Sequence, residues 1–165
     1  MKNNTKITIL VTGGTFDKEY NEISGKLYFN ESNIKEMLEL GRCKIPVSIK
    51  NLMLKDSLDM VDIDRKLILD ACIQTKIKKI VITHGTDTMT KTAKLLAQNI
   101  KNKTIVFTGA MIPYKFGASD GLFNLGSALT AAQTLESGVY IAINGNIFKW
   151  DEVTKNRKKG IFELI

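Results

Sequence analysis

The sequence has few of the residues on which disulfide-bonded and metal-bound folds depend. It contains two cysteines, Cys43 and Cys72, whose spacing matches no metal site, and a single histidine, His84. Few cysteines and no visible export signal are typical of a reducing compartment, so we expect a cytoplasmic protein with both thiols buried as small apolar side chains. Metal catalysis is not expected, because no cluster of histidine, cysteine and carboxylate residues has the spacing of ligands.

Long hydrophobic runs are also missing. No stretch approaches the roughly 20 apolar residues of a membrane-spanning helix. The polar residues 1–6 lead directly into an apolar strand, so no signal peptide is expected and no membrane partner either. Hydrophobic residues nevertheless make up 44% of the 165 residues, enough for a sizeable core. This length favours one domain over residues 1–165.

The common nucleotide and hydrolase motifs are absent as well. The sequence has no P-loop, no GxGxxG fingerprint and no GxSxG elbow. The formal net charge is +7, but lysines on predicted helix surfaces, such as Lys66 and Lys91, are ordinary solvated residues. No zinc-finger spacing or aromatic RNA-binding signature accompanies the charge, so no nucleic-acid partner is expected. The one dense basic cluster consists of Lys155, Arg157, Lys158 and Lys159.

What the sequence does contain is a regular alternation of strands and helices. Short apolar runs bounded by turn residues predict buried strands, and runs with helical periodicity predict helices. This alternation implies βαβ units and a three-layer, doubly wound, mostly parallel α/β sheet of the flavodoxin-like type. Strands are expected at residues 7–11, 46–54, 79–83, 104–107 and 139–143, and helices at 32–40, 62–76, 88–99 and 121–135.

Three details of this assignment are specific enough to be checked. Ser32 is the expected N-cap of the first helix, which Gly41 ends. Residues 17–24 lack periodicity and are expected to form a long loop, of the kind that serves as a lid, binds ligands or is disordered. The second helix is expected to bury one apolar face, made of Ile63, Leu67, Ile68, Ala71 and Cys72.

Polar turns follow the predicted strands where a parallel sheet binds ligands. Residues 12–15 read Thr-Gly-Gly-Thr. Two glycines permit a sharp turn and close approach of the backbone to a ligand, which places Thr15 at the carboxyl edge of the sheet. A Gly-Gly turn also occurs in loops that bind nothing, so this motif alone leaves both interpretations open. Other hydroxyl-rich turns occur at residues 56–57, 83–88 and 108–109.

The charged residues in these turns each have an ordinary interpretation beside the functional one. Thr86 and Asp87 precede a helix, where such residues cap free N–H groups, but they are also able to face a substrate. Lys155 is a solvated surface charge unless it is buried beside them, where it becomes able to accept a proton. The lone His84 has no evident nucleophile beside it and is more often structural than a general base.

Two of these turns together resemble those of the bacterial-type L-asparaginases. Residues 12–15 after the first strand and residues 83–88, Thr-His-Gly-Thr-Asp-Thr, occur in the order and on the elements that this family uses. Residues 56–60, 108–113, 119–125 and 151–156 extend the resemblance over nearly the whole chain. Typical members are about twice this length and carry a second, smaller domain. The chain therefore resembles a short, single-domain form that lacks the C-terminal domain.

The resemblance implies hydrolysis of L-asparagine to L-aspartate and ammonia through an acyl-enzyme, with no cofactor. Thr15 matches the nucleophile and Thr86 the second catalytic threonine. Asp87 and Lys155 match their charged partners. Residues that match the substrate-binding positions are Gly14, Asp56, Ser57, Thr86 and Asp87. A threonine hydroxyl needs a neighbour to take its proton, and backbone N–H groups at these turns are suited to stabilise an oxyanion.

Two features of the family pattern are altered. Leu58 follows Ser57 where longer members commonly have a glutamine that helps to hold the substrate, and the carboxylate supplied by a neighbouring subunit's second domain has no counterpart. The catalytic tyrosine is assigned to Tyr20, because residues 16–20 resemble the short forms. Tyr28 lies at the spacing of longer members and is the alternative; we expect it to pack in the core or the lid.

Three other functions remain compatible with the sequence. A glutaminase or dual amidohydrolase differs by one substrate methylene, which changes binding by only about 1–3 kcal/mol. A non-catalytic module that binds asparagine or aspartate is the second. The third is the amide-hydrolysing part of a tRNA-dependent amidotransferase, supported only by the basic cluster. Homo-oligomerisation, as a dimer or tetramer, is expected from the family resemblance, because the family's sites lie near subunit contacts.

Overall fold

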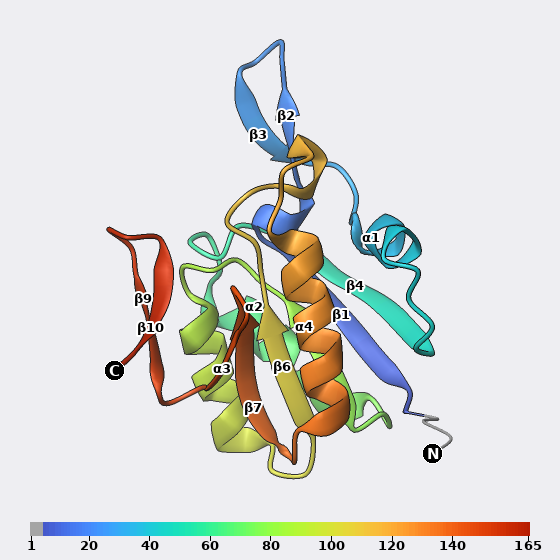
Figure 1. Ribbon diagram of the computed structural model, residues 1–165. Coiled ribbons are helices and arrows are strands. Elements are labelled where there is room, and N and C mark those ends of the chain that lie inside the picture. Colours follow the sequence, from blue (N-terminus) through green and yellow to red (C-terminus); the bar gives the residue numbers. More distant parts are fainter. Residues whose placement is uncertain (1–4) are drawn as a thin grey trace.

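The structure is a computed structural model that describes residues 5–165, and its centre is a single six-stranded sheet (Figure 1). The strand order is β4-β1-β5-β6-β7-β8, and all neighbouring strands are parallel except β7 and β8. Without β8 this is the flavodoxin-like order, so the predicted fold class is confirmed. The strands are β1 Ile7–Gly13, β4 Val47–Lys55, β5 Lys79–Thr83, β6 Thr104–Thr108, β7 Gly138–Ile143 and β8 Asn146–Lys149.

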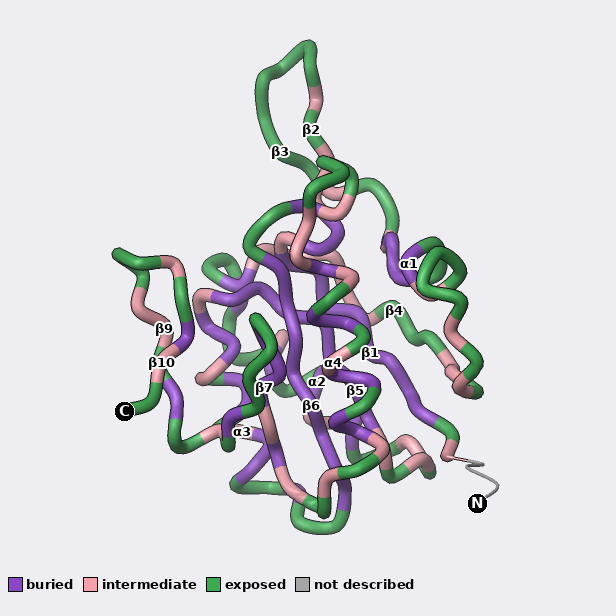
Figure 2. The backbone as a smooth tube through the Cα atoms, viewed as in Figure 1, coloured by how far each residue is buried: buried purple, intermediate pink, exposed green. Residues whose placement is uncertain are grey.

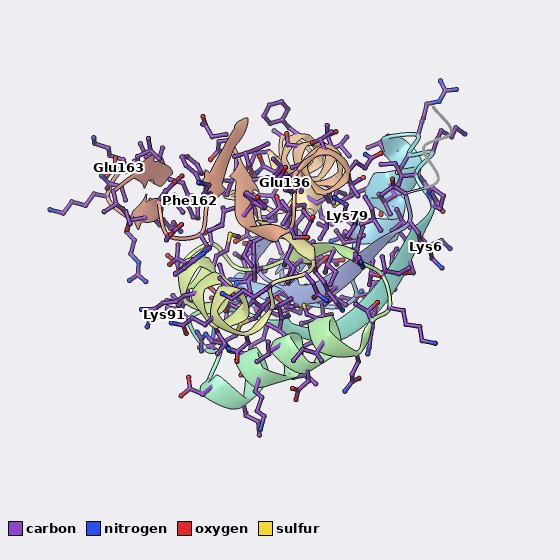
Figure 3. The ribbon with its side chains drawn as sticks, turned by 90° about the horizontal axis from the view of Figure 1, so that it is seen from below. Lys6, Lys79, Lys91, Glu136, Phe162 and Glu163 are labelled. Atoms are coloured by element: carbon purple, nitrogen blue, oxygen red, sulfur yellow. The ribbon has the colours of Figure 1, made fainter. Side chains whose placement is uncertain are left out.

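Helices cover both faces of this sheet, as Figure 3 shows from below. Because side chains alternate along a strand, each strand feeds two cores. Val81 and Val106 pack with the side of α1 and α4, whereas Ile82 and Phe107 pack with the side of α2 and α3. None of the helices within residues 5–165 is long and apolar enough to cross a membrane. The helices are α1 Ile34–Leu40, α2 Asp62–Gln74, α3 Met89–Asn99 and α4 Gly121–Thr134.

The buried face of α2 differs from the predicted one. Ile68, Ala71 and Cys72 are buried as expected, but Ile63 is 74% exposed and Leu67 is 46% exposed. The first turn instead buries Arg65. The prediction was wrong for Ile63 and Leu67 because hydropathy alone gives no reason to turn an arginine inward and an isoleucine outward.

The start of α1 lies slightly later than predicted. The helix begins at Ile34 with Asn33 as its N-cap, so Ser32 lies one residue before the cap. The Ser32 hydroxyl still accepts a hydrogen bond from Ile34 N at 3.3 Å, which satisfies one of the free N–H groups of the first turn. Gly41 ends the helix as expected.

Residues 17–24 are not a long loop but part of a β-hairpin, which corrects the prediction. Strand β2, Lys18–Asn21, pairs antiparallel with β3, Lys26–Phe29. The Asn21 carboxamide oxygen accepts hydrogen bonds from the N–H groups of two turn residues, at 3.0 and 2.8 Å. The hairpin projects beyond the carboxyl edge of the sheet and is mostly exposed on both faces (Figures 1 and 2). A strand solvated on both faces needs no apolar alternation, which is why its sequence shows none.

The C-terminal part contains three strands that the sequence analysis did not predict. Strand β8 adds an antiparallel edge to the sheet. Strands β9, Val153–Asn156, and β10, Ile161–Leu164, form a second two-stranded hairpin. Figure 1 shows this hairpin beside the edge of the sheet that carries β7. Short 3-10 turns occur at Thr15–Asp17 and Tyr114–Phe116.

Candidate active site

The turn that carries Thr15 is packed directly against two neighbouring strand ends. Gly13 and Gly14 have φ angles of 95° and 79°, which L side chains rarely adopt. A Cβ added to Gly13 would lie 2.4 Å from Lys55 N, and one added to Gly14 would lie 2.4 Å from Gly85 N. Both glycines are therefore required by conformation and by space, and they bring the end of β1 against those of β4 and β5.

The same close packing continues to the other strand ends. A Cβ on Gly85 would lie 2.6 Å from the Ser57 hydroxyl, and one on Gly109 would lie 3.0 Å from a Thr86 methyl carbon. The predicted polar turns thus meet at one edge of the sheet. Thr15, adjoining Gly14, is half-buried, and its hydroxyl takes part in no hydrogen bond within residues 5–165. The turns that carry Thr15 and Thr86 are adjacent because Gly14 and Gly85, the residues before them, are in contact.

Lys155 is the residue that closes this edge. It lies on β9, and its Nζ donates to Thr86 Oγ1 at 2.7 Å and to Asp87 Oδ1 at 2.9 Å. The Lys155 side chain is only 10% exposed, and Asp87 is also approached by Arg157 Nε at 3.5 Å. Lys155 is thus largely withdrawn from solvent beside Thr86 and Asp87, the arrangement in which the sequence analysis gives it a functional interpretation. A strand that the sequence did not predict positions it.

The side chains of Thr86 and Asp87 face Lys155 rather than capping α3. The N-cap of α3 is Thr88, and its side chain makes no cap hydrogen bond to the helix. Thr86 Oγ1 accepts from Lys155 and donates to Met111 Sδ at 3.7 Å. Of the two readings that the sequence left open, the geometry favours the one in which these side chains serve a site.

Asp56 and Ser57 lie at the end of β4 on the same edge. Lys18, from the N-terminal hairpin, forms an ion pair with Asp56. Partial burial raises the pKa of Asp56, but the hydrogen bonds from Lys18 and Leu58 N and the charges of Lys18 and Lys155 outweigh it, so the pKa lies below its usual value. Ser57 is 1% exposed, and its Oγ accepts a hydrogen bond from Thr88 N at 3.3 Å.

Both tyrosines lie on the N-terminal hairpin rather than against Thr15. Tyr20 is 54% exposed, and its hydroxyl lies 4.0 Å from a Cβ built on Gly25 at the hairpin turn. Tyr28 is 41% exposed and donates a hydrogen bond to Glu19 at 3.2 Å, which raises the pKa of the phenol. Tyr28 therefore belongs to the hairpin and not to the core. The catalytic assignment of Tyr20 stays a prediction.

His84 has the structural surroundings of a buried, neutral side chain. It is 0% exposed, and its two ring nitrogens lie 2.8 Å from Gly85 O and 2.9 Å from Thr92 Oγ1. Burial lowers its pKa to about 4, against a smaller opposing effect of the bond to Gly85. Within residues 5–165 no group of three or more histidine, cysteine or carboxylate side chains is arranged to hold a metal ion.

Sequence analysis missed the loop that brings Met111 to Thr86. The Asp120 carboxylate accepts hydrogen bonds from Met111 N and Ile112 N, each at 3.0 Å, and Asn124 Nδ2 donates to Gly109 O at 2.9 Å. These bonds join residues 108–113 to residues 119–125, the two segments that carry family-like motifs. The motifs are visible in the sequence, but the hydrogen bonds between them could not be predicted from it.

A second missed residue is Asp17, which anchors the turn that carries Thr15. It is 0% exposed, and Asn33 N donates to its Oδ1 at 2.8 Å. Its Oδ2 is buried and has no hydrogen-bond partner within residues 5–165. Burial raises the pKa of Asp17 to about 6, although the hydrogen bonds from Asn33 and Ser32 oppose the shift. No signal in the sequence distinguishes this aspartate from an exposed one.

Asp17→Asn is expected to change how stability depends on pH. The folded-state pKa of about 6 exceeds the ordinary value of 3.8, so this carboxyl favours folding below pH 4 and loses that contribution as the pH rises through 6. The shift is worth at most about 3 kcal/mol. The substitution should stabilise the protein at pH 8 by roughly 1–2 kcal/mol, measured as the free energy of unfolding in urea from pH 4 to 8.

Asp151→Asn provides the matched control, because it removes a carboxylate from an exposed position. Its curve should run parallel to the wild-type curve over the whole range. If the Asp17→Asn curve also runs parallel to the wild-type curve, the carboxyl of Asp17 titrates normally and the assignment is wrong.

Comparison with known proteins adds an independent line of evidence. Residues 6–162 match the family model described as asparaginase, N-terminal. The chain is 30% identical to L-asparaginase of Thermococcus kodakarensis over 161 residues, which cover 94% of this chain and 49% of the relative. The solved structure of that thermostable enzyme superposes with a TM-score of 0.85 at 30% identity, covering 97% of this chain and 51% of the other.

Two further relatives show the range of proteins that share this architecture. L-asparaginase 2 of Escherichia coli strain K12 is 34% identical over 173 residues, covering 90% of this chain and 46% of the relative. The D subunit of a glutamyl-tRNA(Gln) amidotransferase from Methanococcus vannielii is 29% identical over 162 residues, covering 94% and 37%. The chain therefore spans less than half of the length of each of these curated relatives.

Proposed function

The chain belongs to the asparaginase family, and on this premise we propose that it hydrolyses L-asparagine to L-aspartate and ammonia. The observation that carries the proposal is the part-buried contact of Lys155 Nζ with Thr86 Oγ1 and Asp87 Oδ1, at 2.7 and 2.9 Å. A lysine, a hydroxyl and a carboxylate meet there, beside a turn that offers the free hydroxyl of Thr15.

We assign the nucleophile to Thr15. Its hydroxyl oxygen attacks the side-chain carboxamide carbon and its proton is passed to the amide nitrogen, so the collapse of the tetrahedral intermediate breaks the C–N bond, releases ammonia and leaves an ester on Thr15. Water then attacks the ester, releasing aspartate and restoring the hydroxyl. The backbone N–H groups of the strand-end turns are suited to stabilise the oxyanion. No cofactor enters either step.

The proton transfers are assigned to the Thr86–Lys155 pair. Lys155 Nζ and Thr86 Oγ1 lie 2.7 Å apart; with Lys155 as the neutral amine, Thr86 takes a proton from the attacking water while its own proton passes to Lys155. Tyr20 is the proposed assistant of Thr15. The hairpin that carries it must approach the strand ends for the phenol to act, because its hydroxyl faces the hairpin turn in this structure.

Substrate binding is assigned to the remaining groups of the edge. Asp87 offers a carboxylate to the α-ammonium, and Ser57 and the backbone at Gly14 bind the α-carboxylate. Asp56 contributes through its ion pair with Lys18. Leu58 is 61% exposed and offers no amide in place of the family glutamine, so we expect weaker binding of the substrate than in longer members.

The test of the proposed function is ammonia release from L-asparagine by the purified protein, with L-glutamine measured in parallel. We expect turnover of asparagine; comparable turnover of glutamine would make the protein a dual amidohydrolase. Thermal stabilisation by aspartate without any ammonia release would show a binding module instead. If aspartate does not stabilise the protein and no ammonia is released, the assignment of this edge as an asparagine site is overturned.

An amidotransferase role is the second candidate, favoured by the Methanococcus vannielii relative and by the basic turn between β9 and β10. Arg157, Lys158 and Lys159 are all exposed, and Arg157 also forms an ion pair with Asp87. Binding of tRNA that weakens steeply with added salt would support this role. The absence of tRNA binding at low salt would exclude it.

We also propose that the protein forms a homo-oligomer, a dimer or tetramer, in the cytoplasm. Large apolar side chains are exposed on the N-terminal hairpin and on the 3-10 turn that it contacts, among them Ile23 at 92% and Phe116 at 51%. Such side chains are typical of surfaces that another chain covers. The free thiols of Cys43 and Cys72 suit a reducing compartment. Light scattering of the purified protein measures the number of chains.

A further inference from the structure

Arg65 is a buried arginine that the proposed mechanism does not use. It lies in the first turn of α2 and is 9% exposed. Its Nη1 donates to Met60 O at 2.9 Å, and its Nη2 donates to Thr88 Oγ1 at 3.1 Å. The buried Nε has no hydrogen-bond partner within residues 5–165. The guanidinium thus joins the turn after β4 to the turn before α3.

Arg65 forms no ion pair within residues 5–165. Its charge helps to lower the pKa of the adjacent Asp64, after the larger effects of Lys55 and Val61 N, but Asp64 forms its ion pair with Lys55. A buried charge without an opposite charge is costly, and proteins normally pair such groups. Burial is the main cause of the lowered pKa of His84, and the hydrogen bond to Gly85 opposes it. The positive charge of Arg65 lowers this pKa further. Its field therefore reaches the turn that follows β5, where an anionic ligand would supply the missing charge.

Thr88 transmits the position of Arg65 to Ser57. Thr88 Oγ1 accepts a hydrogen bond from Arg65, so the proton of the Thr88 hydroxyl points away from Arg65. This proton is donated to Ser57 O at 2.8 Å. Thr88 N in turn donates to Ser57 Oγ at 3.3 Å. Ser57 Oγ therefore already accepts one hydrogen bond, and the O–H of Ser57 is left to donate to an oxygen atom of a ligand. Ser57 is thereby held as a hydrogen-bond donor with a cation behind it.

We propose that Arg65 is a positioning residue that makes the site selective for amides bearing an α-carboxylate. It holds Ser57 as a donor through Thr88 and supplies positive charge behind it. This inference rests on the proposed function, because Ser57 is the group assigned to the α-carboxylate. It adds a source of selectivity in a chain where Leu58 replaces the family glutamine.

The test compares Arg65→Met and Arg65→Lys with Lys66→Met, which removes an exposed charge from the same helix turn. The ligands are L-asparagine and 3-aminopropanamide, which is asparagine without its α-carboxylate and is measured as an inhibitor of asparagine hydrolysis. We expect Arg65→Met to raise KM for asparagine about tenfold with kcat within about threefold. The inhibition constant of 3-aminopropanamide should stay unchanged. Arg65→Lys keeps the charge and should raise KM only about threefold, and Lys66→Met should change neither constant.

Equal losses for both ligands, or a loss confined to kcat, would overturn the inference, because a merely structural role predicts no dependence on the α-carboxylate. If Arg65→Met does not fold, Arg65→Lys decides alone: an unchanged KM overturns the inference. Calorimetric binding of L-aspartate distinguishes a failure of the role of Arg65 from a failure of the proposed function. A wild-type protein that binds aspartate while Arg65→Met binds it equally well refutes only the role of Arg65. A wild-type protein that neither hydrolyses asparagine nor binds aspartate refutes the proposed function, and this inference with it.

Discussion

Replacing Thr15 with alanine is expected to lower kcat for asparagine by about 10³-fold or more, because no acyl-enzyme forms without the attacking hydroxyl. Thr15 is half-buried and makes no side-chain hydrogen bond within residues 5–165, so the fold loses little when its hydroxyl is removed. The midpoint of thermal unfolding should therefore change only slightly. Ammonia release and a melting curve by circular dichroism measure the two effects.

Two further variants separate the nucleophile from other hydroxyls of this edge. Thr15→Ser keeps a hydroxyl and should retain part of the activity. Thr108→Val removes another strand-end threonine, whose hydroxyl donates to Ala142 O at 2.8 Å and does not face the site. This variant should lose about 1 kcal/mol of stability while keeping kcat. Turnover by Thr15→Ala at the wild-type rate would remove Thr15 from the role of nucleophile.

The sheet could be predicted because its strands leave a strong trace in the sequence. A parallel strand covered by helices on both faces must be apolar at every position, as the run from Ile80 to Ile82 illustrates. Such runs are short, end in turn residues and alternate with helices, and this alternation predicts parallel strands joined by right-handed crossovers. The edge on which Thr15, Ser57 and Thr86 meet follows from the same rule, since parallel strands end together.

The N-terminal hairpin escaped prediction because both of its faces are largely solvated, and the C-terminal hairpin because each of its strands has only four residues. Their turns nevertheless share a signal. Asn21 and Asn156 each accept hydrogen bonds from the second and third following N–H groups, and Gly25 N and Gly160 N each donate back to the asparagine carbonyl at 2.8 Å. An asparagine followed four residues later by a glycine is this signal, and it marks both turns.

The buried charges were the least predictable part of the site. Asp17 and Arg65 stand in polar sequence that suits an exposed surface equally well, and no local pattern shows which charge turns inward. Lys155 was assigned from a motif, but its burial depends on a hairpin whose strand β9 packs Val153 into the core. Tertiary contacts decide whether a charge is buried, and the sequence indicates such contacts only where it resembles a known family.

Lys155→Met is the second substitution with a large expected effect. The methionine keeps the length and apolar stem of the lysine but removes the group that donates to Thr86 Oγ1 and Asp87 Oδ1. Loss of a positioned proton-transfer group should lower kcat by about 10²–10⁴-fold. The measurement is ammonia release under saturating asparagine, with aspartate binding measured in parallel to show that the site still forms.

The matched control is Lys158→Met, which removes an exposed lysine from the turn of the same hairpin. It lowers the net charge equally, so it should reproduce any effect that depends only on long-range attraction of the substrate. We expect it to retain wild-type kcat. Comparable losses in the two variants would show that the charge of the hairpin, and not the contact of Lys155 with Thr86, supports turnover. A large loss confined to Lys155→Met, with aspartate still bound, requires the short contact itself, because the two lysines differ in burial and in partners but not in charge.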